Sequence, residues 1–263
     1  MLAPFKEGKI FYKTTGKGRA VILLHGFMES SEMWVKQIDF LKKSNKIITV
    51  DLPGHGNSDC FGYMHTMEFM ADAVQAVIKK LRLRKVILVG HSMGGYVSLA
   101  LAKKNPKILK GICLFHSTAA ADTDERRKLR IRAIEVVKRN KRMFINEAIP
   151  VLYAPDFRNH HKVDIKYSKE MALGTSIQGI IAAIEGMKQR SSSEEFIKQA
   201  DFPIAFIMGK KDAGIPFESV LKQAKSAKRS YSLVLDEVAH MGFVEEPEGC
   251  NKFLSKFIRI CFS

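Results

Sequence analysis

Six short apolar runs, most of them separated by helical segments, are the feature that most restricts how this sequence can fold. The runs are Ala20–His25, Lys46–Asp51, Lys85–Gly90, Leu109–Phe115, Pro203–Gly209 and Tyr231–Asp236. Most are apolar at consecutive rather than alternating positions, which is typical of strands buried on both faces of a parallel sheet. Strands that alternate with helices predict a three-layer α/β fold with right-handed crossovers.

Four intervening or following segments have the patterns of helices, and one segment near the start has those of a hairpin. The predicted helices are Thr66–Lys80, Gly94–Lys104, Phe217–Lys228 and Gly249–Ile260. Asn105-Pro106 ends the second of them, because proline cannot continue a helix. The segment Gly8–Gly18 predicts an antiparallel hairpin at the edge of the sheet.

The alternation of strands and helices stops between Thr118 and Ala200, where helical patterns occur without a strong strand signal. A connection of roughly 80 residues is far longer than is usual between neighbouring elements. We therefore expect an all-helical cap, residues 118–200, inserted into a core domain formed by residues 1–117 and 201–263. Ligands of open α/β sheets bind beyond the carboxyl ends of the strands, so this cap would cover the site.

The composition fits a folded protein, since 46% of the residues are hydrophobic and 27% are charged. The four cysteines form no C-x-x-C pair and have no histidine at metal-ligand spacing, which predicts neither a disulfide framework nor a metal site. The first residues contain no apolar run of signal-peptide length, and the longest uncharged stretch, Val86–Ala102, is too short and too polar for a membrane span. We expect a soluble, cytoplasmic protein.

The segment Gly90-His91-Ser92-Met93-Gly94 fits the pattern G-x-S-x-G between an apolar strand and a helix. In that context a sharp turn exposes the serine hydroxyl at the end of the sheet. The glycines leave room for neighbouring backbone, and the N-terminus of the helix favours negative charge. Ser92 is therefore the predicted nucleophile, and a tightly packed turn without a catalytic role is the alternative.

A serine nucleophile needs a base and an orienting acid, which in this architecture follow in the order acid, then histidine. Three histidines lie well beyond Ser92: His160 and His161 in the cap segment, and His240 after the last strand. The loop after that strand reaches the same sheet edge as Ser92, so His240 is the predicted base. Asp212 follows the preceding strand and is the predicted acid.

Two other carboxylates compete with Asp212 for the role of the acid. Asp122 and Asp124 follow the strand that ends near Phe115, but they lie further into the loop and beside many basic residues. The alternative for Asp212 is a purely structural role, as an N-cap or loop carboxylate before the next helix. The spacing favours Asp212 and leaves the other two as alternatives.

Hydrolysis through a serine also needs two N–H groups that hold the oxyanion. One predicted donor is the backbone N–H of Met93, which directly follows the nucleophile. The other is the N–H of Phe27, in the loop after the first buried strand.

On these segments the chain resembles the α/β-hydrolase superfamily over nearly its whole length. The matching segments are His25-Gly26-Phe27, Asp51–Ser58, Gly90–Gly95, Gly209–Asp212 and Ala239-His240. The resemblance implies a mostly parallel eight-stranded sheet, a helical cap after the sixth strand and no cofactor. It assigns Ser92, Asp212 and His240 to the catalytic triad, and Phe27 and Met93 to the oxyanion hole.

The predicted function is a serine hydrolase, similar to carboxylesterases, that cleaves a small carboxylic ester through an acyl-enzyme. Serine at position 92 argues against epoxide hydrolases and haloalkane dehalogenases, which need aspartate there. His25-Gly26-Phe27 differs from the H-G-G-G run of many lipases, which argues against bulky or long-chain esters. A cofactor-free perhydrolase, a C–C hydrolase and a non-catalytic signalling protein that binds a ligand in the same pocket remain alternatives.

Charge is the last unusual feature, because 43 Lys and Arg against 27 Asp and Glu give a formal net charge of +16. Between Arg126 and Arg142 the only acidic residue is Glu135, and interleaved apolar residues predict a helix with an apolar underside. A solvated, solubilising face explains the pattern. The sharper hypothesis is an acidic carrier protein, such as an acyl-carrier protein, that presents a methyl ester beneath the cap. Since the basic stretch that begins at Arg126 contains no aromatic residue before Phe144, nucleic acid is not expected as a partner.

Overall fold

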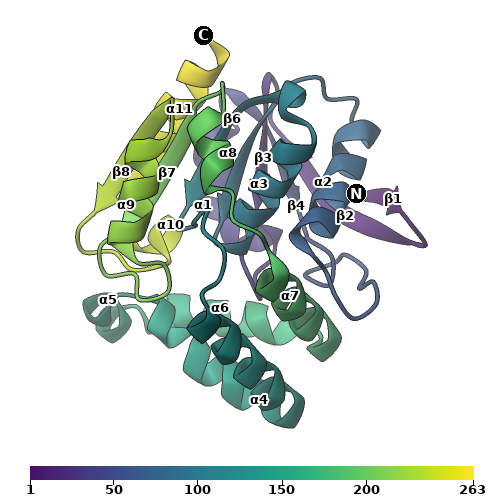
Figure 1. Cartoon of the computed structure of the whole chain (residues 1–263), viewed down its shortest axis with the longest axis vertical. Helices are drawn as coiled ribbons and strands as arrows, with labels where there is room; N and C mark the ends of the chain where they lie inside the picture. Colours follow the sequence, from purple (N-terminus) through teal and green to yellow (C-terminus); the bar gives the residue numbers. More distant parts are fainter.

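The computed structural model describes all of residues 1–263 and contains one eight-stranded sheet between layers of helices (Figure 1). The strands are β1 (Leu2–Phe5), β2 (Gly8–Thr15), β3 (Arg19–Leu24), β4 (Asn45–Val50), β5 (Val86–His91), β6 (Leu109–Phe115), β7 (Ile204–Gly209) and β8 (Ser230–Leu235). Their order is β1-β2-β4-β3-β5-β6-β7-β8; the β1–β2 and β2–β4 pairs are antiparallel, and β3 to β8 run parallel. The expected mostly parallel, eight-stranded α/β fold is confirmed.

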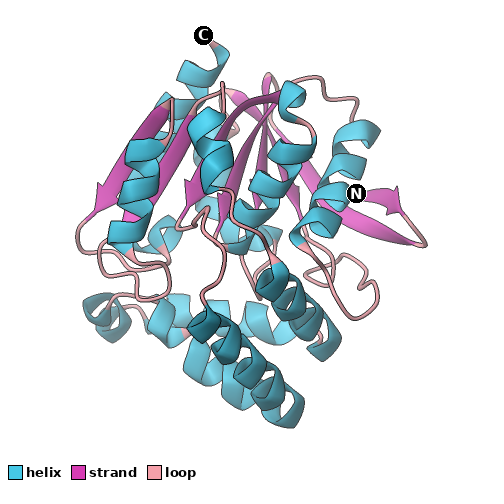
Figure 2. Ribbon diagram, in the orientation of Figure 1, coloured by secondary structure: helices cyan, strands magenta, loops and turns pink.

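Helices cover both faces of the sheet (Figure 2). They are α1 (Val35–Leu41), α2 (Met67–Lys80), α3 (Met93–Lys104), α9 (Phe217–Ser226), α10 (Gly242–Glu245) and α11 (Pro247–Phe262), with short 3₁₀ turns at Ser31–Trp34, Pro106–Ile108 and Pro150–Leu152. The four expected helices correspond to α2, α3, α9 and α11. Helices α2, α3 and α9 lie on one face, and α1 and α11 lie together on the other.

The N-terminal hairpin differs from the expectation. Residues Gly8–Thr15 form a single strand, β2, and its hairpin partner is β1. The turn lies at Lys6-Glu7, where Lys6 has a φ of 49°. The prediction that Gly8–Gly18 contains both strands of the hairpin was wrong, because the turn is formed by Lys6 and Glu7, two charged residues that are not typical of turns.

The segment between β6 and β7 is entirely helical, as expected. It contains α4 (Asp124–Ala148), α5 (Pro155–His160), α6 (Lys162–Gly174), α7 (Ile177–Gln189) and α8 (Glu194–Gln199). Helices α4 to α7 lie beyond the carboxyl ends of the parallel strands, whereas α8 returns to the sheet layer and packs beside α9 (Figure 1). The helical insertion is therefore confirmed, and residues 118–200 as a separate cap unit stay a proposal.

Helix α4, which carries most of the basic run, is interrupted at Asn140 (φ −155°, ψ 88°). The Asn140 side chain accepts the Met143 N–H at 2.9 Å and so caps the second half of the helix. The predicted apolar underside is smaller than the sequence suggested. Ile134 and Val137 are buried, but Leu129 and Ile131, on the same helix, are exposed.

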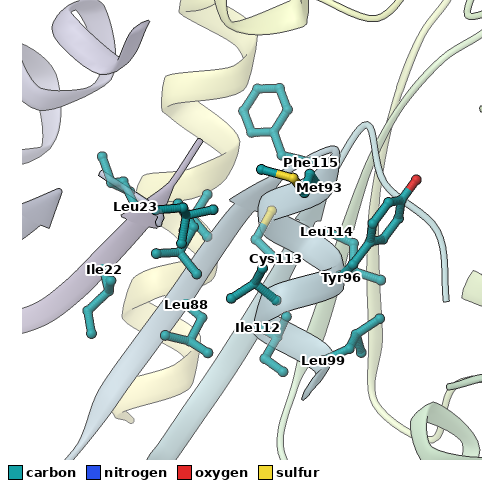
Figure 3. Packing of buried hydrophobic residues seen from close by; sticks show 14 of the residues in the cluster. Ile22, Leu23, Leu88, Met93, Tyr96, Leu99, Ile112, Cys113, Leu114 and Phe115 are labelled. Atoms are coloured by element: carbon teal, nitrogen blue, oxygen red, sulfur yellow. The ribbon is translucent and has the colours of Figure 1, made fainter. Parts of the chain in front are cut away.

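A continuous hydrophobic core of 72 residues fixes the strands from which the candidate site projects. Figure 3 shows how Met93, Tyr96 and Leu99 of α3 face apolar side chains of the central strands, among them Leu88 and Ile112. All four cysteines are free thiols, three of them buried. None of the helices is both long enough and apolar enough to cross a bilayer.

Candidate active site

Ser92 lies in the sharp turn between β5 and α3, with φ 47° and ψ −112°. Non-glycine residues seldom occupy this region, and they persist there where the surrounding structure fixes the turn. A Cβ atom on Gly90 would lie 2.3 Å from the carbonyl carbon of Gly94, and one on Gly94 would lie 2.3 Å from the carbonyl oxygen of Leu24. Close backbone packing on both sides of Ser92 therefore accounts for the two glycines of the motif.

Asp212 and His240 meet at the same edge of the sheet, on the loops that follow β7 and β8. The distance from Asp212 Oδ2 to His240 Nδ1 is 2.7 Å. The other carboxylate oxygen, Oδ1, accepts the N–H groups of Gly214 at 2.8 Å and of Ile215 at 2.9 Å. Both side chains are almost completely buried, so the carboxylate holds the imidazole in one orientation.

Burial and mutual attraction shift the pKa values of this pair apart. For Asp212, burial favours the protonated acid, but the charge and hydrogen bond of His240 outweigh it and lower the pKa to about 2. For His240, burial lowers the pKa, but the neighbouring Asp212 carboxylate outweighs it and raises the pKa above its ordinary value. Asp212 is therefore ionised throughout the physiological range.

Ser92 and His240 line the same cavity, which has a volume of about 190 Å³ and lies between the sheet edge and the helical insertion. Loops at this sheet edge and helix α3 contribute part of its lining, and the helical insertion contributes the rest. The lining residues are Phe27, Met28, Glu29, His91, Ser92, Tyr96, Gly214 and His240 from outside the helices of the insertion, and Arg126, Arg130, Phe144, Ala148, Leu152 and Met187 from the insertion. A small molecule in this cavity would contact Ser92 and His240 together.

The two predicted oxyanion donors lie next to this cavity. Phe27 lines it, and its backbone N–H has no acceptor within the protein. Met93 is the first residue of α3, where helix geometry leaves an N–H without an intrahelical partner. Neither N–H group therefore donates a hydrogen bond within the protein.

The alternative acids are engaged elsewhere. The buried Asp122 carboxylate accepts hydrogen bonds from Arg130 and from Arg190, the latter at 2.6 Å. Asp124 is exposed and pairs with Arg127 at 2.9 Å. Neither contacts His240, and the alternative histidines His160 and His161 are exposed on the helical insertion.

Sequence reasoning missed two groups around the Asp212–His240 pair. His116, the residue after β6, is buried with a φ of 45°, and its Nδ1 lies 3.7 Å from Asp212 Oδ2. Glu29 Oε2 accepts the Gly26 N–H at 2.6 Å and lies 2.8 Å from Nδ1 of His91. The Nε2 atom of His91 in turn lies 3.0 Å from the carbonyl oxygen of His240.

A chain of close contacts thus links the loop after β3 to the loop that carries His240. His116 follows β6 and Glu29 lies in the loop after β3. These positions could have indicated both residues, because the carboxyl ends of parallel strands meet at one edge of the sheet. His91 is more than the packing residue that the sequence suggested, because both its ring nitrogens contact acceptors.

Several characterised proteins are similar to this chain. A solved structure of a thermophilic esterase from Thermogutta terrifontis (malate bound) superimposes with a TM-score of 0.94 and 29% identity, over 99% of this chain and 97% of that one. A bifunctional esterase/perhydrolase of Acinetobacter calcoaceticus is 28% identical over 97% of this chain and 98% of its own length. The acetyltransferase component of an acetoin cleaving system of Pseudomonas putida is 26% identical, and the chain spans 64% of its length. The profile of the alpha/beta hydrolase fold matches residues 19–247, and the chain belongs to this family.

Proposed function

We propose that this protein is a serine hydrolase that cleaves small carboxylic esters through an acyl-enzyme. The observation that carries the proposal is the 2.7 Å Asp212–His240 pair beside a cavity that Ser92 also lines. The similarity to an esterase at 29% identity and to an esterase/perhydrolase at 28% supports the same reaction class.

In the proposed mechanism the Ser92 hydroxyl attacks the ester carbonyl while His240 Nε2 takes its proton. The N–H groups of Phe27 and Met93 stabilise the negative charge that develops on the carbonyl oxygen. His240 then gives the proton to the leaving alcohol. Water, deprotonated by His240, cleaves the acyl-enzyme and releases the acid and Ser92. Asp212 orients the ring and stabilises its protonated form throughout.

Perhydrolysis is the second candidate, because it differs only in the last nucleophile. If hydrogen peroxide replaces water at the acyl-enzyme, the product is a peracid, as the similarity to an esterase/perhydrolase suggests. The two reactions are distinguished by measuring the peracid formed from a short carboxylic acid and hydrogen peroxide alongside the rate of ester hydrolysis. C–C hydrolysis would use the same three residues, and a diketone substrate tests it.

The proposal is tested with a chromogenic short-chain ester under stopped-flow conditions. A rapid burst of alcohol, followed by slower steady turnover, is the expected signature of an acyl-enzyme. Labelling of Ser92 by a fluorophosphonate would identify the nucleophile. Tight binding of esters with neither a burst nor turnover would instead favour a ligand-binding protein of the same fold.

The acidic limb of the pH profile should have its midpoint above pH 6.5. His240 acts as a base only when neutral, and its pKa is raised above 6.5 by the Asp212 carboxylate against the opposing effect of burial. Activity should therefore rise with pH through that raised value. The measurement is kcat/KM of a neutral ester from about pH 5 to 8.5. A midpoint at or below 6.5 would contradict the assignment of His240.

We also propose that the outward face of α4 steers an acidic carrier protein. Arg127, Arg132 and Lys138 are exposed there, whereas Arg130 is turned inward against Asp122. Replacing these three outward residues with glutamate should slow hydrolysis of a carrier-bound ester and leave a small neutral ester unaffected. Added salt should have the same effect on the unaltered protein, because screening acts over about 8–10 Å. Equal effects on both substrates would contradict carrier binding and indicate that the basic face of α4 only improves solubility.

The four free cysteines support a location in a reducing compartment such as the cytoplasm. The proposed chemistry uses protein groups alone and gives no step to a metal or a cofactor.

A further inference from the structure

The cap side of the catalytic cavity contains a charge cluster that the proposed mechanism does not use. It consists of the Asp122 carboxylate and the guanidinium groups of Arg126, Arg130 and Arg190. Three positive charges against one negative charge leave a local excess of two. Arg190 is nearly buried and its guanidinium lies 3.9 Å from the centre of the Tyr96 ring, so the excess is presented by the other two arginines.

Arg126 and Arg130 both line the cavity that contains Ser92. Arg126 Nη1 donates to the carbonyl oxygen of Gly214 at 2.5 Å, and Arg130 donates to Asp122 through Nε and Nη2. These bonds hold the two side chains in place. Arg126 Nη2 and Arg130 Nη1 have no protein acceptor, which leaves one terminal N–H₂ group of each arginine for a ligand.

The other side of the cavity is different in character. Phe27, Glu29 and Leu152 also line a second cavity of about 90 Å³, to which neither arginine contributes. Most of its remaining lining is apolar, and it includes Met33, Ile149, Met171, Met241, Phe243 and Val244. The space around Ser92 is therefore cationic toward α4 and apolar toward this second cavity.

We propose that Arg126 and Arg130 form a carboxylate subsite, so that the preferred substrates are esters with a carboxylate in one part and an apolar group in the other. This inference rests on the proposed ester chemistry for its biological meaning. Guanidinium groups bind carboxylates through directed N–H bonds, and a covered cavity strengthens the attraction. The Glu29 carboxylate, on the side shared with the second cavity, repels a substrate bound in the reverse direction and so orients it.

The test compares matched esters that differ in one carboxylate. 4-Nitrophenyl hemiglutarate against 4-nitrophenyl pentanoate places the charge in the acyl part; 4-acetoxybenzoate against 4-methylphenyl acetate places it in the leaving part. Arg126→Gln should lower the charged-to-neutral ratio of kcat/KM by about 10- to 100-fold in one pair, the usual loss for a hydrogen bond to a charged group. Arg126→Lys should restore part of the ratio.

Arg139→Gln is the matched control, because it removes the same charge from an exposed position on the same helix. It should leave both ratios unchanged. Arg130→Gln is less suitable as the first variant, since it removes a partner of the buried Asp122.

A binding measurement keeps this inference separate from the proposed reaction. In the Ser92→Ala background, calorimetry with monomethyl glutarate should show binding that Arg126→Gln weakens about tenfold or more. Ratios and binding that Arg126→Gln leaves unchanged would overturn the subsite while the hydrolase stands. Binding that depends on Arg126, in a protein with no Ser92-dependent turnover, would support the subsite and overturn the hydrolase.

Discussion

Replacing Ser92 with alanine is expected to lower the turnover of a short-chain chromogenic ester by about 10⁶-fold, the loss seen when a triad nucleophile is removed. The acyl-enzyme cannot form without the hydroxyl, and the remaining rate reflects only binding and the oxyanion donors. The free energy of unfolding should change by less than about 0.5 kcal/mol, because alanine keeps the Cβ atom and the strained turn of residue 92. Steady-state kinetics and urea denaturation measure the two quantities.

Ser98→Ala is the matched control for this experiment. Its buried hydroxyl donates to the Gly94 carbonyl on the same helix, at 2.8 Å, and does not line the cavity. Turnover in this variant should stay close to that of the unaltered protein. Wild-type rates in Ser92→Ala would show that the ester is cleaved without the proposed nucleophile.

Asp212→Asn is expected to lower turnover by about 10⁴-fold while the cavity keeps its shape. The amide oxygen of asparagine can keep the bonds from the Gly214 and Ile215 N–H groups, which directs the amide nitrogen toward His240. His240 Nδ1 must then accept a hydrogen bond from this amide, so the neutral ring carries its proton on Nε2. Nε2 is the atom that must be unprotonated to take the proton of Ser92. The acidic limb of the pH profile should also move downward, because the charge that raises the His240 pKa is gone.

Asp122→Asn tests whether the acid follows the correct strand. Asp122 is buried and hydrogen-bonded to two arginines, so its loss should cost about 3 kcal/mol of stability, as for other broken buried pairs. Turnover of a neutral ester by the folded protein should fall far less than in Asp212→Asn. A larger loss in Asp122→Asn would contradict the assignment of Asp212.

Local signals explain why much of the fold was predictable. Consecutive apolar residues identified the six parallel strands to within one or two residues, and the strand–glycine–serine–glycine–helix pattern placed Ser92 in its turn. Asp212 and His240 could be chosen because the chain order of their loops follows from the architecture. The 2.7 Å distance between Asp212 Oδ2 and His240 Nδ1 joins residues on different loops, so only the folded structure gives it.

The misjudged features depended on contacts between distant segments. The hairpin turn at Lys6-Glu7 is imposed by pairing of β1 with β2 rather than by turn residues. Arg126 and Arg130 belong to a basic run whose sequence pattern predicts a solvated face. In the structure Arg126 donates to the Gly214 carbonyl and Arg130 donates to the Asp122 carboxylate, so both side chains point toward the cavity. The position of His116 after β6 was a signal, but its 3.7 Å approach to Asp212 likewise depends on residues far apart in the sequence.

The cavity is built from two structural parts, the core around the sheet and the helical insertion. Ser92, Asp212 and His240 come from loops of the sheet, whereas the wall opposite them comes from α4, the Pro150–Leu152 turn and α7. Under the proposals above, bond cleavage and the selectivity for a carboxylate would then be encoded in different parts of the chain, and each could change in evolution without the other. Grafting residues 124–189 from a relative should transfer that relative's preference onto this catalytic core, so the insertion is the region to randomise when a new specificity is sought.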